Sequence, residues 1–485
     1  MATMIDTQYY FVCLVLLFLS TLLLKSLFKK PSKTLRLPPS PPALPIIGHL
    51  HLLGSSLSQS LHKLSTKYGP LLYLRLGASQ CLVVSTASLA TEIFKTNDLV
   101  FSDRPSFAFS DRLPYGNYGF FSARYGDYWR FIKQLCMSEL LSTQQVEQSR
   151  DVRHEEIVCF LLKALESAKK QHVFDVGAEL MKLTNNSTCK LTMSMRCSEE
   201  HDEAERIRQL VKESMEVGEK IVLGDVFGPL KILAFWLYGK KAINGTLKYD
   251  AILEKVLKQH EESPQKENKD LMDILLKVYH DDKAEFKINR THLKAFLLLN
   301  SSIIPNIFNK VREEIKTVVG TRLVEESDVS SLPYLQAVVK EALRLHPPIP
   351  VVVRETREDC KIKDFDIPEK TMVAINVYAI MRDAKIWNYP NDFQPERFLI
   401  SSKEKYGMEY IPFGAGRRGC PGSKLALSMI HTTVAAMVQC FDWNVGGEGD
   451  HAKVNMQVAP SFTMPMAQPF ICVPVVHFNP FISSM

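Results

Sequence analysis

The chain has 485 residues, which exceeds the usual size of a single hydrophobic core, so we expect one large domain or two fused domains. Hydrophobic residues make up 46% of it and charged residues 23%, which excludes a largely disordered protein. The net charge of +6 comes without a long run of Lys or Arg, so we expect no nucleic-acid partner. The ten cysteines include no Cys-x-x-Cys pair, and their scattered spacing predicts a reducing compartment rather than a zinc ribbon.

An apolar run near the start of the chain covers Tyr9–Leu24 and continues past Lys25 to Phe28. If Lys25 snorkels, the run reaches the roughly 20 residues that span a bilayer. Asp6 precedes the run and the basic residues follow it, which favours an uncleaved signal anchor over a cleaved signal peptide. Residues 1–30 are therefore predicted to be a single membrane anchor, with the body on the cytoplasmic side.

The next segment, Leu37–Pro45, is rich in proline and predicts a stiff polyproline-like hinge over residues 31–48. The body is then expected to occupy residues 49–485 and to be mainly α-helical with small β-sheets. Periodicity and turn residues predict, in chain order, the helix Ser58–Tyr68, the strands Leu71–Leu76 and Cys81–Ser85, a helix around Trp129, a mostly helical region over 150–290, the helices Asn306–Val319 and Leu332–Leu345, the strand Val351–Arg354, the helix Ser423–Val438, and short strands at Phe441–Val445 and Phe470–Val475.

A glycine-rich loop, Phe413–Gly422, ends in one cysteine and leads directly into the helix Ser423–Val438. The helix N-terminus and the loop N–H groups predict a stabilised thiolate at Cys420, and Arg418 adds a positive charge. A thiolate in such a pocket is a good axial ligand for haem iron. A structural cysteine in a turn is the alternative, but the ungapped pattern Phe-x-x-Gly-x-Arg-x-Cys-x-Gly opposes it.

This loop resembles the haem-binding loop of cytochromes P450, and the resemblance extends over nearly the whole chain. It implies the cytochrome P450 fold after one transmembrane helix, haem b (iron protoporphyrin IX) as cofactor, and Cys420 as the axial ligand of the iron. Trp129 and Lys133 share a helix face, which alone is typical of an ordinary amphipathic helix. The resemblance makes them propionate contacts, with Lys133 in place of the usual arginine. The haem-binding residues implied in this way are Cys420, Arg418, Trp129, Lys133, Arg354, Phe413 and Gly416.

The helix Leu332–Leu345 contains Glu341 and Arg344 at a spacing that by itself is typical of a surface ion pair. Arg397 lies downstream, where cytochromes P450 place a second arginine against such a pair. The resemblance therefore implies a buried structural clamp of Glu341, Arg344 and Arg397 that holds the cysteine loop.

One part of the family pattern is broken. A cytochrome P450 needs a distal helix about 45 Å long, or about 30 residues, with a central Gly-x-Asp-Thr type of motif that feeds protons to iron-bound oxygen. Here Thr291–Leu299 supplies roughly 14 Å and then Asn300–Pro305 leads into the next helix. No such motif occurs between 270 and 330, and Ser301 and Ser302 before Pro305 are typical of a turn. The distal helix is thus predicted to be truncated near residues 296–305, and no catalytic acid/Thr pair is assigned.

Three explanations for this gap stay open. We favour the absence of a segment of roughly 25–30 residues through a mis-called exon or alternative splicing, because both flanks are normal. The others are a decaying gene copy and a P450-fold hydroperoxide isomerase that does not activate O2.

Three framework stretches resemble plant microsomal cytochromes P450 of the flavonoid, isoflavonoid and triterpenoid branch, including flavone synthase II. They are Pro45–Leu53, Leu332–Val338 and Gln439–Trp443. The resemblance implies a haem-thiolate monooxygenase that hydroxylates or desaturates an apolar plant metabolite. It also implies electrons from NADPH through NADPH-cytochrome P450 reductase, and a single-pass location in the endoplasmic reticulum membrane. The alternative is an inactive, truncated or mis-spliced relative.

Overall fold

The computed structural model describes residues 35–105, 118–193, 231–262, 271–280, 309–400, 406–445 and 466–481, together with positions 20, 116, 213, 457–459 and 463–464. The predicted anchor at residues 9–28 lies outside these residues except for Ser20. Within the described ranges, no helix is both long enough and apolar enough to cross a bilayer. The truncated distal helix near 296–305 also falls outside them.

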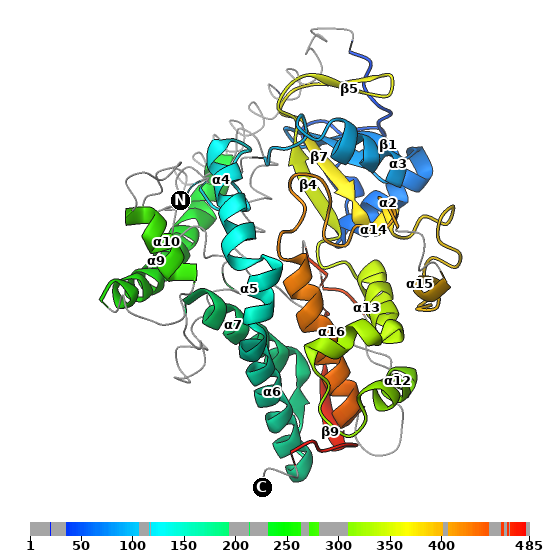
Figure 1. Cartoon of the computed structure of the whole chain (residues 1–485). Helices are drawn as coiled ribbons and strands as arrows, with labels where there is room; N and C mark the ends of the chain where they lie inside the picture. Colours follow the sequence, from blue (N-terminus) through cyan, green and yellow to red (C-terminus); the bar gives the residue numbers. More distant parts are fainter. Residues whose placement is uncertain are drawn as a thin grey trace, which may run out of the picture.

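A four-stranded mixed sheet forms the core of one part of the molecule (Figure 1). Its strand order is β1 (Leu71–Leu76), β2 (Ser79–Val84), β7 (Met372–Asn376) and β4 (Val351–Glu355). β1 and β2 form a hairpin closed by Gly77-Ala78, where Gly77 takes the positive φ of 60° that such tight turns need. β2 runs parallel to β7, and β7 is antiparallel to β4. This pairing sets Arg354, near the end of β4, opposite Val373, and its guanidinium lies over the ring of Phe94.

Helices make up most of the rest of the described chain. They are η1 (Leu50–Leu52), α2 (Leu57–Tyr68), α3 (Ala87–Thr91), η2 (Glu92–Thr96), α4 (Asp127–Leu135), η4 (Cys136–Leu140), α5 (Thr143–Gln148), α6 (Arg150–Lys170), α7 (Val176–Met193), α9 (Lys231–Glu262), α10 (Leu271–His280), α12 (Asn309–Val319), η6 (Glu326–Ser331), α13 (Pro333–Leu345), α14 (Val377–Ile380), α15 (Arg397–Ile400) and α16 (Ser423–Cys440). The sequence predictions for the elements at 58–68, 71–76, 332–345 and 351–354 are confirmed to within a residue.

The two smaller sheets come from short strands. One has the order β3 (Phe174–Asp175), β9 (Ile471–Val476) and β8 (Phe441–Asn444), and the other pairs β5 (Cys360–Ile362) with β6 (Phe365–Ile367). The expected mainly helical fold with small sheets is therefore observed.

Helix α16 runs through the middle of the molecule (Figure 1), and every residue from Met429 to Cys440 is buried. Its apolar side chains join one core cluster with residues of α6, α7, α12 and α13. A helix that is apolar all round needs such burial on every side. The cluster fixes the axis of α16, and thereby the place where the cysteine loop meets its N-terminus.

The proline-rich hinge is packed against the sheet. The N–H of Tyr73 in β1 donates to the carbonyl of Pro39 at 2.9 Å. His49 is 2% exposed, and its Nδ1 accepts the N–H of Arg75 while its Nε2 lies 2.7 Å from the carbonyl of Pro41. Residues 39–49 are therefore held as part of the folded body, so the fold begins before the predicted boundary at residue 49.

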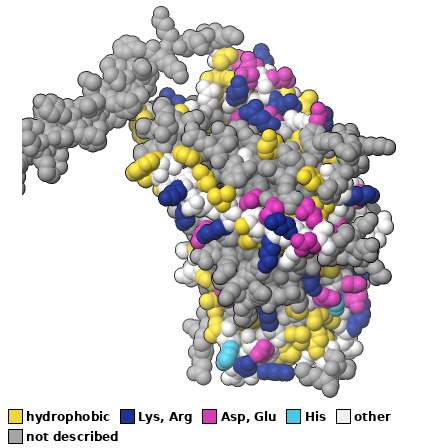
Figure 2. All heavy atoms as spheres, turned by 90° about the vertical axis from the view of Figure 1, so that its left-hand side faces the viewer, with side chains coloured by type: hydrophobic (Ala, Val, Ile, Leu, Met, Phe, Trp, Pro, Cys, Tyr) yellow, Lys and Arg dark blue, Asp and Glu magenta, His cyan; other side chains and the backbone are white. Residues whose placement is uncertain are grey.

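Figure 2 shows one outer face of the molecule. Lys and Arg side chains lie beside Asp and Glu side chains over the middle of this face, so its charges are mixed in sign.

One histidine of α16 makes stability depend on pH. Burial lowers the pKa of His431 to about 4, and its Nε2 is buried without a hydrogen-bond partner. The unfolded chain takes up a proton near the ordinary pKa of 6.5, so stability should fall as pH drops from about 6.5 towards 4. Substituting His431→Leu should therefore reduce the loss of stability between pH 7 and pH 5 by about 2 kcal/mol. Denaturant unfolding at pH 7 and pH 5 checks this, and an unchanged difference between the two pH values would contradict it.

Candidate functional site

The loop that carries Cys420 is a sequence of tight turns closed by backbone hydrogen bonds. Gly414 N–H donates to Ile411, Gly419 N–H to Gly416, and Cys420 N–H to Phe413, each at 3.0 Å. Gly414 and Gly416 have φ values of 69° and 70°, which favour glycine. The loop therefore holds the Cys420 backbone at a fixed place just before α16. The carbonyl oxygen of Phe413 accepts the N–H of Cys420, and its side chain packs against the core cluster of α16.

Gly416 and Gly414 offer a matched pair for testing how tightly the loop is packed. A Cβ at Gly416 would lie 2.5 Å from Oδ1 of Asp98 and 3.0 Å from the carbonyl oxygen of Phe94, whereas one at Gly414 would meet nothing within 4 Å. Both Gly→Ala changes carry the cost of a positive φ, about 1–2 kcal/mol, but only Gly416→Ala adds a clash. We expect Gly416→Ala to lower the free energy of unfolding by about 1–3 kcal/mol more than Gly414→Ala. Equal losses in denaturant unfolding would show that the clash does not matter.

The thiol of Cys420 is free and exposed. Although the residue is exposed, the protein atoms packed around the sulfur partly desolvate it and raise its pKa, and the backbone hydrogen bond from Gly422 offsets this only in part. The prediction that the helix N-terminus, the loop N–H groups and Arg418 stabilise a thiolate at Cys420 stays a prediction. The guanidinium of Arg418 donates to the carbonyls of Ser102 and Ala123. A thiol that coordinates a metal ion is deprotonated by the metal itself.

Three arginines meet beside the loop: Arg354 and Arg418 are buried, and Arg104 is half-buried. Arg354 is 2% exposed and Arg418 is 9% exposed, and Arg354 Nη2 lies 3.4 Å from the carbonyl of Arg418. Arg104 Nη1 donates to the carbonyl of Val353 at 2.6 Å, and its Nε is buried without a hydrogen-bond partner. Among the described residues, none of the three makes an ion pair with a carboxylate.

The charge states of these arginines show how costly the cluster is. Burial, and then mutual repulsion, lower the pKa of Arg354 to about 9 and that of Arg104 well below its usual value. Burial lowers the pKa of Arg418 to about 10. Asp103 and Asp98 raise the pKa values of Arg418 and Arg354 only in part, so an anion from outside the described chain would stabilise the cluster.

Arg104 was not predicted as a site residue from the sequence. It stands next to Pro105 in a turn-rich stretch, and only the fold brings it to Val353, 249 positions away. The dipeptide itself carries no signal for an anion site, so local pattern alone could not have identified it.

Trp129 and Lys133 lie on α4 beside this cluster, with contacts that differ from those expected. The indole N–H of Trp129 donates to the carbonyl of Phe120 at 3.1 Å, and the guanidinium of Arg418 lies 4.3 Å from the centre of the indole ring. Lys133 Nζ donates to the carbonyl of Arg417. Their direct contact with a propionate remains a prediction. In this structure, the indole ring of Trp129 packs against the guanidinium of Arg418, and Lys133 donates a hydrogen bond to the backbone of the cysteine loop.

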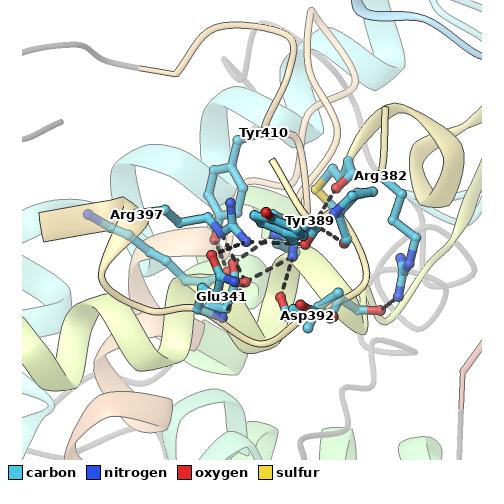
Figure 3. A network of polar contacts seen from close by, with 12 residues as sticks. Glu341, Arg382, Tyr389, Asp392, Arg397 and Tyr410 are labelled. Carbon is cyan, nitrogen blue, oxygen red and sulfur yellow. Dashed lines mark hydrogen bonds and ion pairs between the residues drawn. The ribbon is translucent and has the colours of Figure 1, made fainter. Parts of the chain in front are cut away.

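The predicted clamp residues come together in the interior, where Figure 3 shows Arg397 beside Glu341. Arg344 pairs with both carboxylate oxygens of Glu341, at 2.7 and 2.9 Å, and both residues are fully buried. Arg397 reaches the same carboxylate at 3.1 Å. Arg344 also donates to the carbonyls of Met381 and Pro390 at 2.8 Å. The carboxylate therefore joins α13 to the segment 381–397.

The residues present fit haem. The Cys420 sulfur is accessible for an axial bond, and the buried cluster of Arg104, Arg354 and Arg418 lacks the anion that two propionates would supply. Haem iron held by a Cys thiolate supplies the chemistry of O–O cleavage. Gly416 and Phe413 shape the loop, Arg354 and Arg418 present guanidinium donors, and Trp129 backs Arg418.

Known proteins match this chain over most of its length. The cytochrome P450 family model matches residues 38–301 and 296–473. A zebra fish cytochrome P450, solved with abiraterone, superposes with a TM-score of 0.71 at 23% identity, covering 88% of this chain and 100% of its own. This likeness shows the fold.

Two curated plant proteins match over almost their whole length. Cytochrome P450 705A22 of Arabidopsis thaliana is 43% identical, with 98% of both chains covered. Beta-amyrin 24-hydroxylase of Glycine max is 41% identical, covering 99% of this chain and 100% of that protein.

The matches also locate the break. The two parts of the family match overlap at residues 296–301, within the stretch where the distal helix is predicted to be truncated. The alignment with cytochrome P450 705A22 spans 508 positions, but 98% of 485 residues is only about 475, so about 33 positions face gaps in this chain. With the family matched on both sides of this break, the chain belongs to the cytochrome P450 family.

Proposed function

We propose that the gene encodes a haem-thiolate monooxygenase that hydroxylates or desaturates an apolar plant metabolite with O2. The single observation that carries the proposal is an exposed Cys420 on the loop beside Arg104, Arg354 and Arg418, none of which makes an ion pair with a carboxylate of the described residues. This donor set matches a flat iron cofactor with two acidic arms.

A triterpenoid, a flavonoid or an isoflavonoid is the substrate class we propose. The name of the Glycine max relative, beta-amyrin 24-hydroxylase, supports a triterpenoid, and the matched framework stretches support the same branch. We further propose that electrons come from NADPH through the reductase in the endoplasmic reticulum membrane, with the body on the cytoplasmic side.

A second candidate function has its own observation. The break in the family match at 296–301 favours an inactive form of 485 residues, because the missing segment carries both scaffold and the oxygen-side groups. A hydroperoxide isomerase is less well supported, since the gap removes scaffold that such enzymes also need.

Sequencing the transcript across Phe296–Pro305 separates these candidates. We expect a longer form that encodes a Gly-x-Asp-Thr type of motif. That form, expressed with the reductase, should oxidise triterpenoid or flavonoid substrates in an NADPH- and O2-dependent way. A longer form that binds haem through the thiolate, yet oxidises none of these substrates, would overturn the proposed substrate class. Turnover of hydroperoxides without NADPH would support the isomerase instead.

A further inference from the structure

The carboxylate of Asp98 lies against the backbone just before Cys420. Asp98 follows η2, and both of its oxygens accept the backbone N–H of Arg417 at 3.2 Å. Its Oδ2 also pairs with Arg417 Nε at 3.1 Å. The space between Asp98 and Gly416 is too small for a Cβ. The carboxylate is therefore seated tightly against the loop rather than merely near it.

The same residue of the loop is held from its other side. Lys133 Nζ, from α4, donates to the carbonyl of Arg417. Side chains from two elements distant in sequence thus hold both polar backbone groups of Arg417. The hydrogen bonds from Gly419 N–H to Gly416 and from Cys420 N–H to Phe413 connect Arg417 to Cys420 through a tight turn. A fixed Arg417 backbone therefore also fixes the backbone of the cysteine.

We propose that Asp98 is a positioning residue for Cys420, which fixes the loop so that the sulfur faces the haem site. Hydrogen bonds to a charged acceptor are roughly twice as strong as neutral ones, so a carboxylate suits this role better than an amide. Asp98 also places a negative charge beside the basic groups of the site, where it counteracts the lowering of the pKa of Lys133 and Arg354 by burial. The role of Asp98 in holding the loop is independent of the proposed function, whereas its effect on haem ligation rests on that function.

Hydrogen exchange of the 485-residue chain without added haem tests the inference directly. Asp98→Ala removes the acceptor, so the peptide that contains residues 412–422 should exchange about tenfold faster or more at its protected amide. Asp98→Asn keeps an acceptor without charge and should give a smaller increase. Asp359→Ala is the matched control, because its carboxylate accepts the N–H of Glu369 at 2.8 Å outside the loop.

Exchange of this peptide that is unchanged in both Asp98 variants would overturn the inference, as would the same acceleration in Asp359→Ala. If Asp98→Ala does not fold, the isosteric Asp98→Asn decides alone. A second measurement uses the longer form of the chain: at equal bound haem, Asp98→Ala should convert part of the thiolate-type reduced-CO band into the thiol-type band. If the unsubstituted longer form shows no thiolate-type band while exchange responds as expected, the proposed function fails and the positioning role stands.

Discussion

Replacing Glu341 with glutamine is expected to lower the free energy of unfolding by about 3–5 kcal/mol. Glu341 and Arg344 are fully buried, and Arg397 shares the same carboxylate with its side chain only 11% exposed. The substitution leaves two buried guanidinium groups without a counter-charge, and this cost far exceeds that of a lost surface ion pair. Equilibrium unfolding in denaturant, followed by circular dichroism, measures the change.

Glu396→Gln provides the control for this experiment. Glu396 pairs with Lys310 at 2.9 Å, but both side chains are largely exposed, at 48% and 67%. Removing that charge should leave the unfolding midpoint almost unchanged. Similar losses for Glu341→Gln and Glu396→Gln would show that burial of the clamp does not contribute to stability.

Replacing Cys420 with serine should abolish the thiolate-type reduced-CO spectrum in the longer form of the chain. No other described cysteine combines an exposed side chain with a place beside the buried arginines; Cys81, Cys136, Cys440 and Cys472 are buried. The change replaces one exposed atom, so unfolding should be nearly unaffected. Cys360→Ser, in β5, should keep the full spectrum, and a surviving thiolate-type band in Cys420→Ser would remove Cys420 from the role of ligand.

Much of the fold could be predicted because its signals are local. The strand Leu71–Leu76 follows from its apolar and aromatic composition next to a glycine turn, and α16 begins directly after the loop that ends at Gly422. The spacing of Glu341 and Arg344 on one helix is also visible in sequence. Their burial is not visible, because it depends on Arg397 and on carbonyls of the segment 381–392.

The details of the site depended on contacts that no local pattern encodes. Arg104 and Arg354 meet only because β4 is placed by its pairing with β7. Arg418 was expected beside the thiol, but its guanidinium donates to the carbonyls of Ser102 and Ala123 instead. The protein atoms that partly desolvate the exposed Cys420 could not be read from the loop sequence either.

The central claim is that this chain keeps the cysteine side of the site and lacks the middle of the distal helix. The most direct test compares reduced-CO spectra of the 485-residue chain and of a chimera that carries, at residues 296–301, the corresponding segment of beta-amyrin 24-hydroxylase. We predict a thiolate-type band for the chimera and none for the 485-residue chain. A full thiolate-type band from the 485-residue chain, together with NADPH-dependent turnover, would contradict the account.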